Sequence, residues 1–234
     1  MSGWLVGLPL TSGPVIFFLA LEQGNRFATG ASLGVILGIT SQAVFALAYV
    51  RLVRTAGWIP RVAAGTVAYV AATIVFQIVR LPAAIEPVFV FASLVLAIGL
   101  MSPGRAVAMR IASAPPGDLP LRIVVTTGLV IGLTSIAPVL GAYVSGLVSP
   151  FPLYAAILAV FAHRLGGAAA ATSVWRGLLF GLFSFLAFFT VLAAVLMPFG
   201  IALGFVFATM AALAVQAATL PILRFARPPN SLTP

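Results

Sequence analysis

The chain lacks cysteine and lysine and is poor in acidic residues. Its 234 residues include no Cys, three acidic residues and one His. Without Cys there is no disulfide, no thiolate metal site and no Cys-linked lipid. A phosphate-binding loop needs Lys after its glycines, and metal hydrolases need clustered His and carboxylates. We therefore expect no enzymatic activity, no metal and no cofactor.

Charge of either sign is also scarce. Only 6% of the residues are charged and 62% are hydrophobic, whereas a soluble domain carries roughly 25% charged residues. A chain of this composition cannot cover itself with a water-facing surface. The composition therefore predicts an all-α integral membrane protein, with membrane lipids as its surroundings.

The uncharged stretches indicate how often the chain crosses the bilayer. Four of them are one crossing long and two are longer: residues 1–21, 27–50, 62–79 and 87–104, then 123–162 and 177–223. A crossing needs about 20 apolar residues, so each longer stretch holds two helices. We expect about eight transmembrane helices in one domain over residues 1–234, with 223–234 as a cytoplasmic tail.

The basic residues indicate the orientation. All twelve are Arg, and they lie between the hydrophobic stretches. With eight crossings and a cytoplasmic N-terminus, only Arg26 and Arg80 fall outside. Because Arg-rich short loops stay in the cytoplasm, we expect both termini there. This placement explains the net charge of +9 by topology, so we expect no nucleic acid as partner.

The first third of the chain resembles the last third. The polar, proline and glycine positions that fall together in order are Pro14 and Pro152, Arg26 and Arg164, Gly38 and Gly181, and Gln77 and Gln216. The pattern predicts a three-helix repeat A (residues 1–82) and repeat B (140–222), joined by two connecting helices in 83–139. Five crossings separate equivalent helices, so the copies are inverted, as in many secondary transporters.

The first helix of each predicted repeat is interrupted by Pro and Gly, in segments 8–14 and 146–152. Matched breaks in inverted repeats indicate a substrate site, and helices starting at Pro14 and Pro152 would direct positive ends toward an anion. Ordinary proline kinks or a surface loop are the alternative. The candidate substrate-binding residues are Ser12, Gly13, Pro14, Ser41, Gln42, Ser149, Pro152 and Ser184.

Glu22 is the candidate proton-coupling residue, because ionisable side chains within membrane segments are usually functional. An exposed interfacial carboxylate near Arg26 is the alternative.

Glycines recur at four-residue spacing, most clearly at Gly30, Gly34 and Gly38. Such spacing brings helix backbones close together. We expect tight helix packing rather than a gate. The spacing leaves open a homodimer through these Gly-xxx-Gly faces.

Residues 120–222 resemble the GlpM-type small bacterial inner-membrane proteins, through Tyr143–Pro152, Arg176–Gly181 and Ser184. The chain is also similar to the LysE-like exporter group, with Ser12-Gly13-Pro14 at that group's Pro-Gly-Pro position. The first resemblance implies a bacterial inner-membrane location, and the second implies efflux of a small solute.

Together these features favour a secondary transporter that exports a small polar or anionic solute. The alternative is a non-transporting accessory subunit that scaffolds an envelope lipid or polysaccharide machinery. Inverted repeats with paired breaks favour the transporter, and the scarcity of charge within the membrane favours the accessory subunit.

Overall fold

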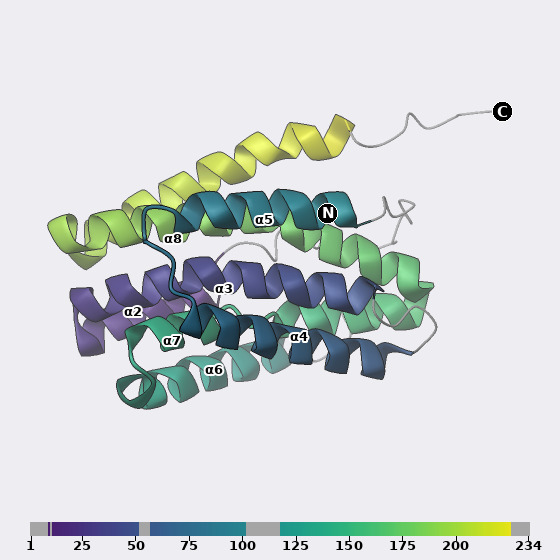
Figure 1. The fold of residues 1–234 in the computed structure, drawn as a ribbon, viewed down its shortest axis with the longest axis horizontal. Coiled ribbons are helices and arrows are strands. Elements are labelled where there is room, and N and C mark those ends of the chain that lie inside the picture. Colours follow the sequence, from purple (N-terminus) through teal and green to yellow (C-terminus); the bar gives the residue numbers. More distant parts are fainter. Residues whose placement is uncertain (1–8, 10, 52–56, 102–117, 226–234) are drawn as a thin grey trace.

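The fold comes from a computed structural model, which describes residues 9, 11–51, 57–101 and 118–225. All the regular secondary structure in these residues is helical, which confirms the all-α prediction. The helices are α2 (Ser12–Gln23), α3 (Asn25–Arg51), α4 (Trp58–Ile78), α5 (Glu86–Leu100), α6 (Asp118–Leu140), α7 (Ala142–Val148) and α8 (Leu153–Phe225) (Figure 1).

Helix α3 forms the centre of the bundle. It packs against α2, α4, α5, α7 and α8, and the helices run roughly along the long axis of the molecule (Figure 1). Its apolar side chains are buried around most of its circumference, including Leu37, Phe45 and Tyr49. A helix that is apolar on all sides needs neighbours on all sides, and α3 has them.

Helix α8 is three rods rather than one. A straight helix of its 73 residues would be about 110 Å long. Gly167 and Gly200 interrupt it, with φ of +70° and +74°, a conformation that glycine adopts without strain. The rings of Phe188 and Phe205 lie 6.0 Å apart, so the chain folds back at Gly200, as the yellow segment in Figure 1 shows. The rods are residues 153–166, 168–199 and 201–225.

The structure does not show the eight separate membrane-spanning helices that the sequence predicts. In the described part of the chain, three stretches are long and apolar enough to cross a membrane: α3, α4 and residues 142–218. Helices α2 and α5 have 12 and 15 residues, fewer than the roughly 20 of a full crossing. The last stretch counts once because its rods join at single glycines without a loop.

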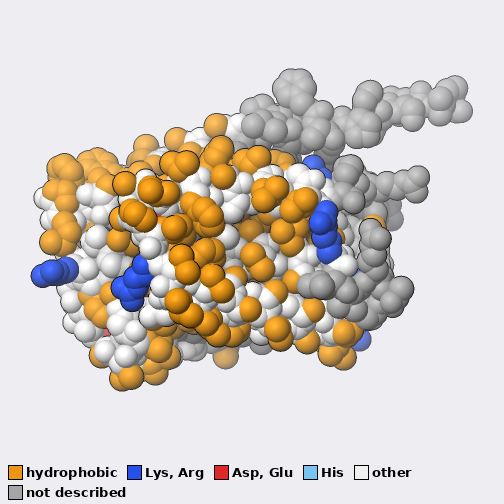
Figure 2. Space-filling view, viewed as in Figure 1, with side chains coloured by type: hydrophobic (Ala, Val, Ile, Leu, Met, Phe, Trp, Pro, Cys, Tyr) orange, Lys and Arg blue, Asp and Glu red, His pale blue; other side chains and the backbone are white. Residues whose placement is uncertain are grey.

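The outer surface is suited to lipid. Helix α4 exposes apolar side chains along one side, including Val67 (69% exposed), Ile74 (54%) and Ile78 (77%). Figure 2 shows hydrophobic side chains over the middle of one face and arginines toward the two ends. Water would not tolerate so broad an apolar surface, whereas hydrocarbon does. The chain is therefore a multi-pass helical membrane protein.

The glycine stripe of α3 is filled by α7. A Cβ atom at Gly34 would collide with the Tyr143 carbonyl, and one at Gly38 would lie 2.9 Å from the Leu147 carbonyl oxygen. In return, a Cβ atom at Gly146 of α7 would collide with the backbone of α3. The two backbones are in direct contact, which confirms the prediction of tight helix packing.

Candidate functional site

The described parts of the two segments, residues 9 and 11–14 and residues 146–152, are in contact. Ser12, the first residue of α2, donates a hydrogen bond of 3.1 Å from its hydroxyl to the carbonyl oxygen of Ser149, which follows α7. Both residues are fully buried. Positions 137 apart in the sequence thus share one place in the fold.

The α7–α8 break is tightly held by the protein itself. Tyr69 of α4 donates its buried hydroxyl to the Leu147 carbonyl oxygen at 2.8 Å, where α7 would otherwise leave an unpaired acceptor. The Phe151 amide donates to Val148, and α8 begins immediately after Pro152, whose carbonyl accepts from Ala156. These carbonyl oxygens are therefore closed to water and lipid in this arrangement.

The break before α2 differs from the expected half-helix. Helix α2 begins at Ser12, two residues before Pro14. The Gly13 amide donates to the Pro9 carbonyl at 2.9 Å and the Val15 amide donates to Thr11 at 3.3 Å. Pro14 has no amide hydrogen to offer. The Gly13 and Val15 amides at the start of α2 are therefore paired within the protein.

Two polar atoms beside the meeting point have no hydrogen-bond partner among the described residues. They are Oγ of Ser149 and Oε1 of Gln42, both buried. Gln42 lies one turn beyond Gly38 on α3, and a Cβ atom at Gly38 would touch the ring of Pro150 at 2.5 Å. Gln42 therefore lies on the side of α3 that faces the break. A buried unpaired polar group costs about 1–3 kcal/mol, so a bound hydrogen-bonding group would be stabilised here.

The two remaining serines are engaged elsewhere. Ser41 of α3 accepts a hydrogen bond of 3.2 Å from the Thr73 hydroxyl of α4. Ser184 donates to the carbonyl of Gly181 in its own helix at 2.8 Å. Both are fully buried. They stabilise helix packing in this arrangement.

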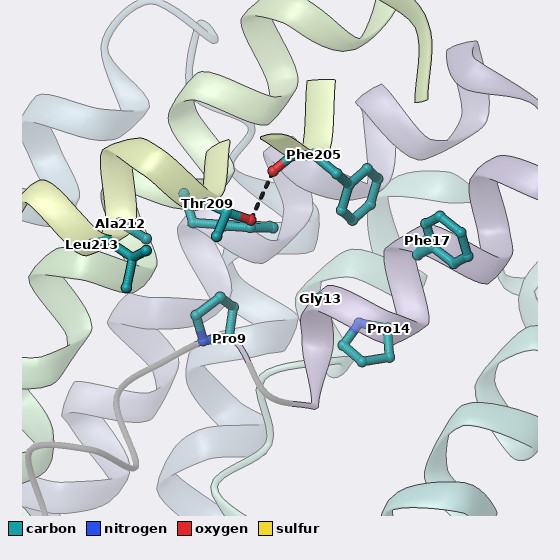
Figure 3. Close-up of a pocket in the computed structure, with 9 residues that line it drawn as sticks. Pro9, Gly13, Pro14, Phe17, Phe205, Thr209, Ala212 and Leu213 are labelled. Carbon is teal, nitrogen blue, oxygen red and sulfur yellow. Dashed lines mark hydrogen bonds between the residues drawn. The ribbon is translucent and has the colours of Figure 1, made fainter. Parts of the chain in front are cut away.

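An apolar pocket of about 430 Å³ lies on the outer side of the α2 break. Figure 3 shows it between α2 and the last rod of α8. Its apolar lining includes Pro9, Gly13, Pro14, Phe17, Phe188 and Phe205. Thr209, which also lines it, donates its hydroxyl to the Phe205 carbonyl at 2.7 Å. Pro14 therefore borders an apolar pocket rather than a polar one, and the sequence analysis did not predict this pocket.

Glu22 lies apart from these residues. It is exposed near the far end of α2, about 15 Å along the helix from Ser12. The position matches the interfacial carboxylate that we gave as the alternative. A coupling role for Glu22 stays a prediction, without a contact to the breaks that would support it.

Comparisons with protein-family models, with curated proteins and with solved structures find no match for this chain. The resemblance to GlpM-type and LysE-like proteins thus rests on the short motifs, and the geometry of the site carries the functional argument.

Proposed function

We propose that this chain is a secondary transporter that exports a small polar solute across the bacterial inner membrane. The observation that carries the proposal is the hydrogen bond between Ser12 and Ser149, which joins the two helix breaks. Beside this hydrogen bond lie two groups without a described partner. The Ser149 hydroxyl can donate a hydrogen bond, and the Gln42 amide oxygen can accept one. This pair suits a neutral hydrogen-bonding group better than an anion.

The inverted repeat is part of this proposal, and two turns support it. Gly24 and Gly167 lie 143 positions apart (167 − 24), the separation of Gly38 and Gly181. Both turn glycines have positive φ, +84° and +70°, and each joins a short helix to a long one. This similarity supports repeat A (residues 1–82) and repeat B (140–222), although pairing Gly24 with Gly167 excludes the pairing of Arg26 with Arg164 because the two arginines lie on opposite sides of their glycines.

The proposed topology has eight crossings with cytoplasmic termini. Each of the three rods of α8 is counted as one crossing. The first rod, residues 153–166, forms its crossing together with α7, and the break between them interrupts it. Arg51 and Arg176 support the orientation, since both donate to carbonyls at the end of α5, from Leu100 and Met101. Both arginines fall on the side that the charge rule makes cytoplasmic.

In this proposal the described arrangement is an occluded state. Tyr69 and Ser12 close the carbonyls of the α7–α8 break, so no path for a polar solute leads through it. Rocking one repeat against the other separates the breaks and opens the Ser149 side of the site to one compartment at a time.

Flux from vesicles tests the proposal. The full chain is reconstituted into lipid vesicles loaded with a carboxylate, phosphate, an amine or a sugar. We expect the neutral sugar to leave faster than from protein-free vesicles. The Ser149→Ala variant should slow it about 5–30-fold, for loss of 1–2 kcal/mol of binding. Ser173→Ala is the control, since that hydroxyl bonds only its own helix. Equal release from all protein-containing and protein-free vesicles would overturn the proposal.

The accessory-subunit function remains the second candidate because the pocket at Pro9 and Pro14 is apolar. Such a pocket fits an acyl chain or a partner helix. This second function predicts two results. No solute class shows protein-dependent flux, and an envelope enzyme is recovered together with the chain when it is purified from membranes.

A further inference from the structure

Glu86 is a buried carboxylate. It is the first residue of α5 and is 2% exposed. Its Oε2 atom accepts no hydrogen bond from any described residue. An ionised carboxyl group is costly at such a position unless it is paired, and a carboxyl group escapes that cost by taking up a proton.

Glu86 also lies well inside the end of the bundle. The Thr40 and Ser93 hydroxyls are 3.0 Å apart and align α5 with α3. From Ser93 back to Glu86 the helix rises about 10 Å, whereas from Thr40 back to Asn25 it rises about 22 Å. Glu86 is therefore roughly 12 Å short of the α3 end, and Figure 1 shows the α4–α5 connection set back from the α2–α3 turn.

Tyr143 connects Glu86 with Arg80. Tyr143 of α7 is within electrostatic range of both Glu86 and Arg80. The Arg80 guanidinium lies 4.8 Å from the centre of the Tyr143 ring, and Arg80 itself is exposed. The Tyr143 hydroxyl and Oε1 of Gln77, one turn before Arg80, are buried without described partners. Arg80 therefore stacks on Tyr143 beside the carboxylate without pairing with it.

Three arginines of the helices that pack on α5 lie away from Glu86. Arg51 of α3 and Arg176 of α8 donate to carbonyls at the opposite end of α5. Arg26 of α3 is exposed near the α2–α3 turn. Tyr143 is thus the titratable side chain that lies near Glu86, and Arg80 stacks on the Tyr143 ring.

We propose that Glu86 takes up and releases the coupling proton and that Arg80 replaces the proton when Glu86 is charged. On release, the O–H bond of the carboxyl group breaks and the proton passes to water on the exposed Arg80 side. The guanidinium then leaves the Tyr143 ring and pairs with the carboxylate. The coupling role rests on the proposed transport function, whereas proton binding by Glu86 can be tested without transport.

Infrared spectroscopy of the purified full chain tests proton binding. The sequence has three acidic side chains, so a protonated carboxyl band can be assigned by substitution. We expect this band at neutral pH in the wild type. It should be absent in Glu86→Gln and retained in Glu22→Gln and Asp118→Asn. If Glu86→Gln does not fold, Glu86→Asp should keep the band at a shifted frequency. Absence of the band in the wild type, or an unchanged band in either Glu86 variant, overturns the proposal.

The role of Arg80 has its own test. Without the replacing cation, Arg80→Ala should keep Glu86 protonated to a pH at least one unit higher, a tenfold change in proton affinity. Arg26→Ala is the control and should leave the titration unchanged. An unshifted titration in Arg80→Ala contradicts the exchange. If the carboxyl band is present but no solute flux is measured, the transport function is contradicted and proton binding by Glu86 is not. If flux is measured but the band is absent, proton binding by Glu86 is contradicted and transport is not.

Discussion

The Ser12 hydroxyl and the Ser149 carbonyl oxygen form a hydrogen bond between the first and last thirds of the chain, at 3.1 Å. Ser12→Ala removes this bond, whereas Ser149→Ala leaves it in place because the backbone accepts it. We expect Ser12→Ala to lower stability in detergent by about 1–3 kcal/mol, the cost of an unpaired buried acceptor. Ser149→Ala should not lower stability, because the Ser149 hydroxyl has no described partner, and it should slow flux. Equal stability losses in both variants would show that the Ser149 hydroxyl is structural.

Tyr69 is expected to hold the α7–α8 break closed. Tyr69→Phe removes the donor to the Leu147 carbonyl and should cost about 1–3 kcal/mol in the free energy of unfolding. Tyr49→Phe is a matched control, because the Tyr49 hydroxyl is buried without a described partner. Denaturant titration in detergent compares the two. A Tyr69→Phe variant as stable as Tyr49→Phe would contradict this role.

The contact between α3 and α7 predicts strong sensitivity at Gly34. A methyl group there would collide with the Tyr143 carbonyl, and overpacking of this kind costs about 1–3 kcal/mol. Gly99→Ala is the control, since nothing described lies within 4 Å of the added Cβ. Thermal unfolding should show a lower midpoint for Gly34→Ala alone. Identical midpoints would mean that the two backbones are not in contact.

Membrane orientation can be measured with reporter fusions after Gly104, after Gly117 and at the C-terminus. The arginine distribution predicts that all three lie in the cytoplasm, because positive short loops are retained there. A periplasmic signal at any of these positions would contradict the topology of eight crossings.

The sequence predicted the features that depend on composition and spacing. Few charges indicated a helical membrane protein, and the spacing of Gly30, Gly34 and Gly38 indicated close packing, which α7 provides. The paired proline and glycine segments indicated two breaks, which lie in contact through Ser12 and Ser149.

Other features depend on which side chains the fold brings together. The donors that close the break come from Tyr69, whose position in α4 carries no sign of this role. The burial of Glu86 depends on how far α4 and α5 stop short of the end of α3, which the sequence does not show. The prediction of eight separate membrane-spanning helices was wrong because Gly167 and Gly200 turn the chain without a polar loop between the helices.

A single cysteine at position 149 tests most directly whether the breaks form an alternating site. The natural chain has no Cys, so Ser149→Cys introduces the sole thiol. It is treated with a membrane-impermeant maleimide in right-side-out and in inverted vesicles. The account predicts slow modification from both sides, and loss of modification when Ser12→Cys is added and the two thiols are oxidised to a disulfide. Modification from neither side, or from one side alone, would contradict alternating access at this site.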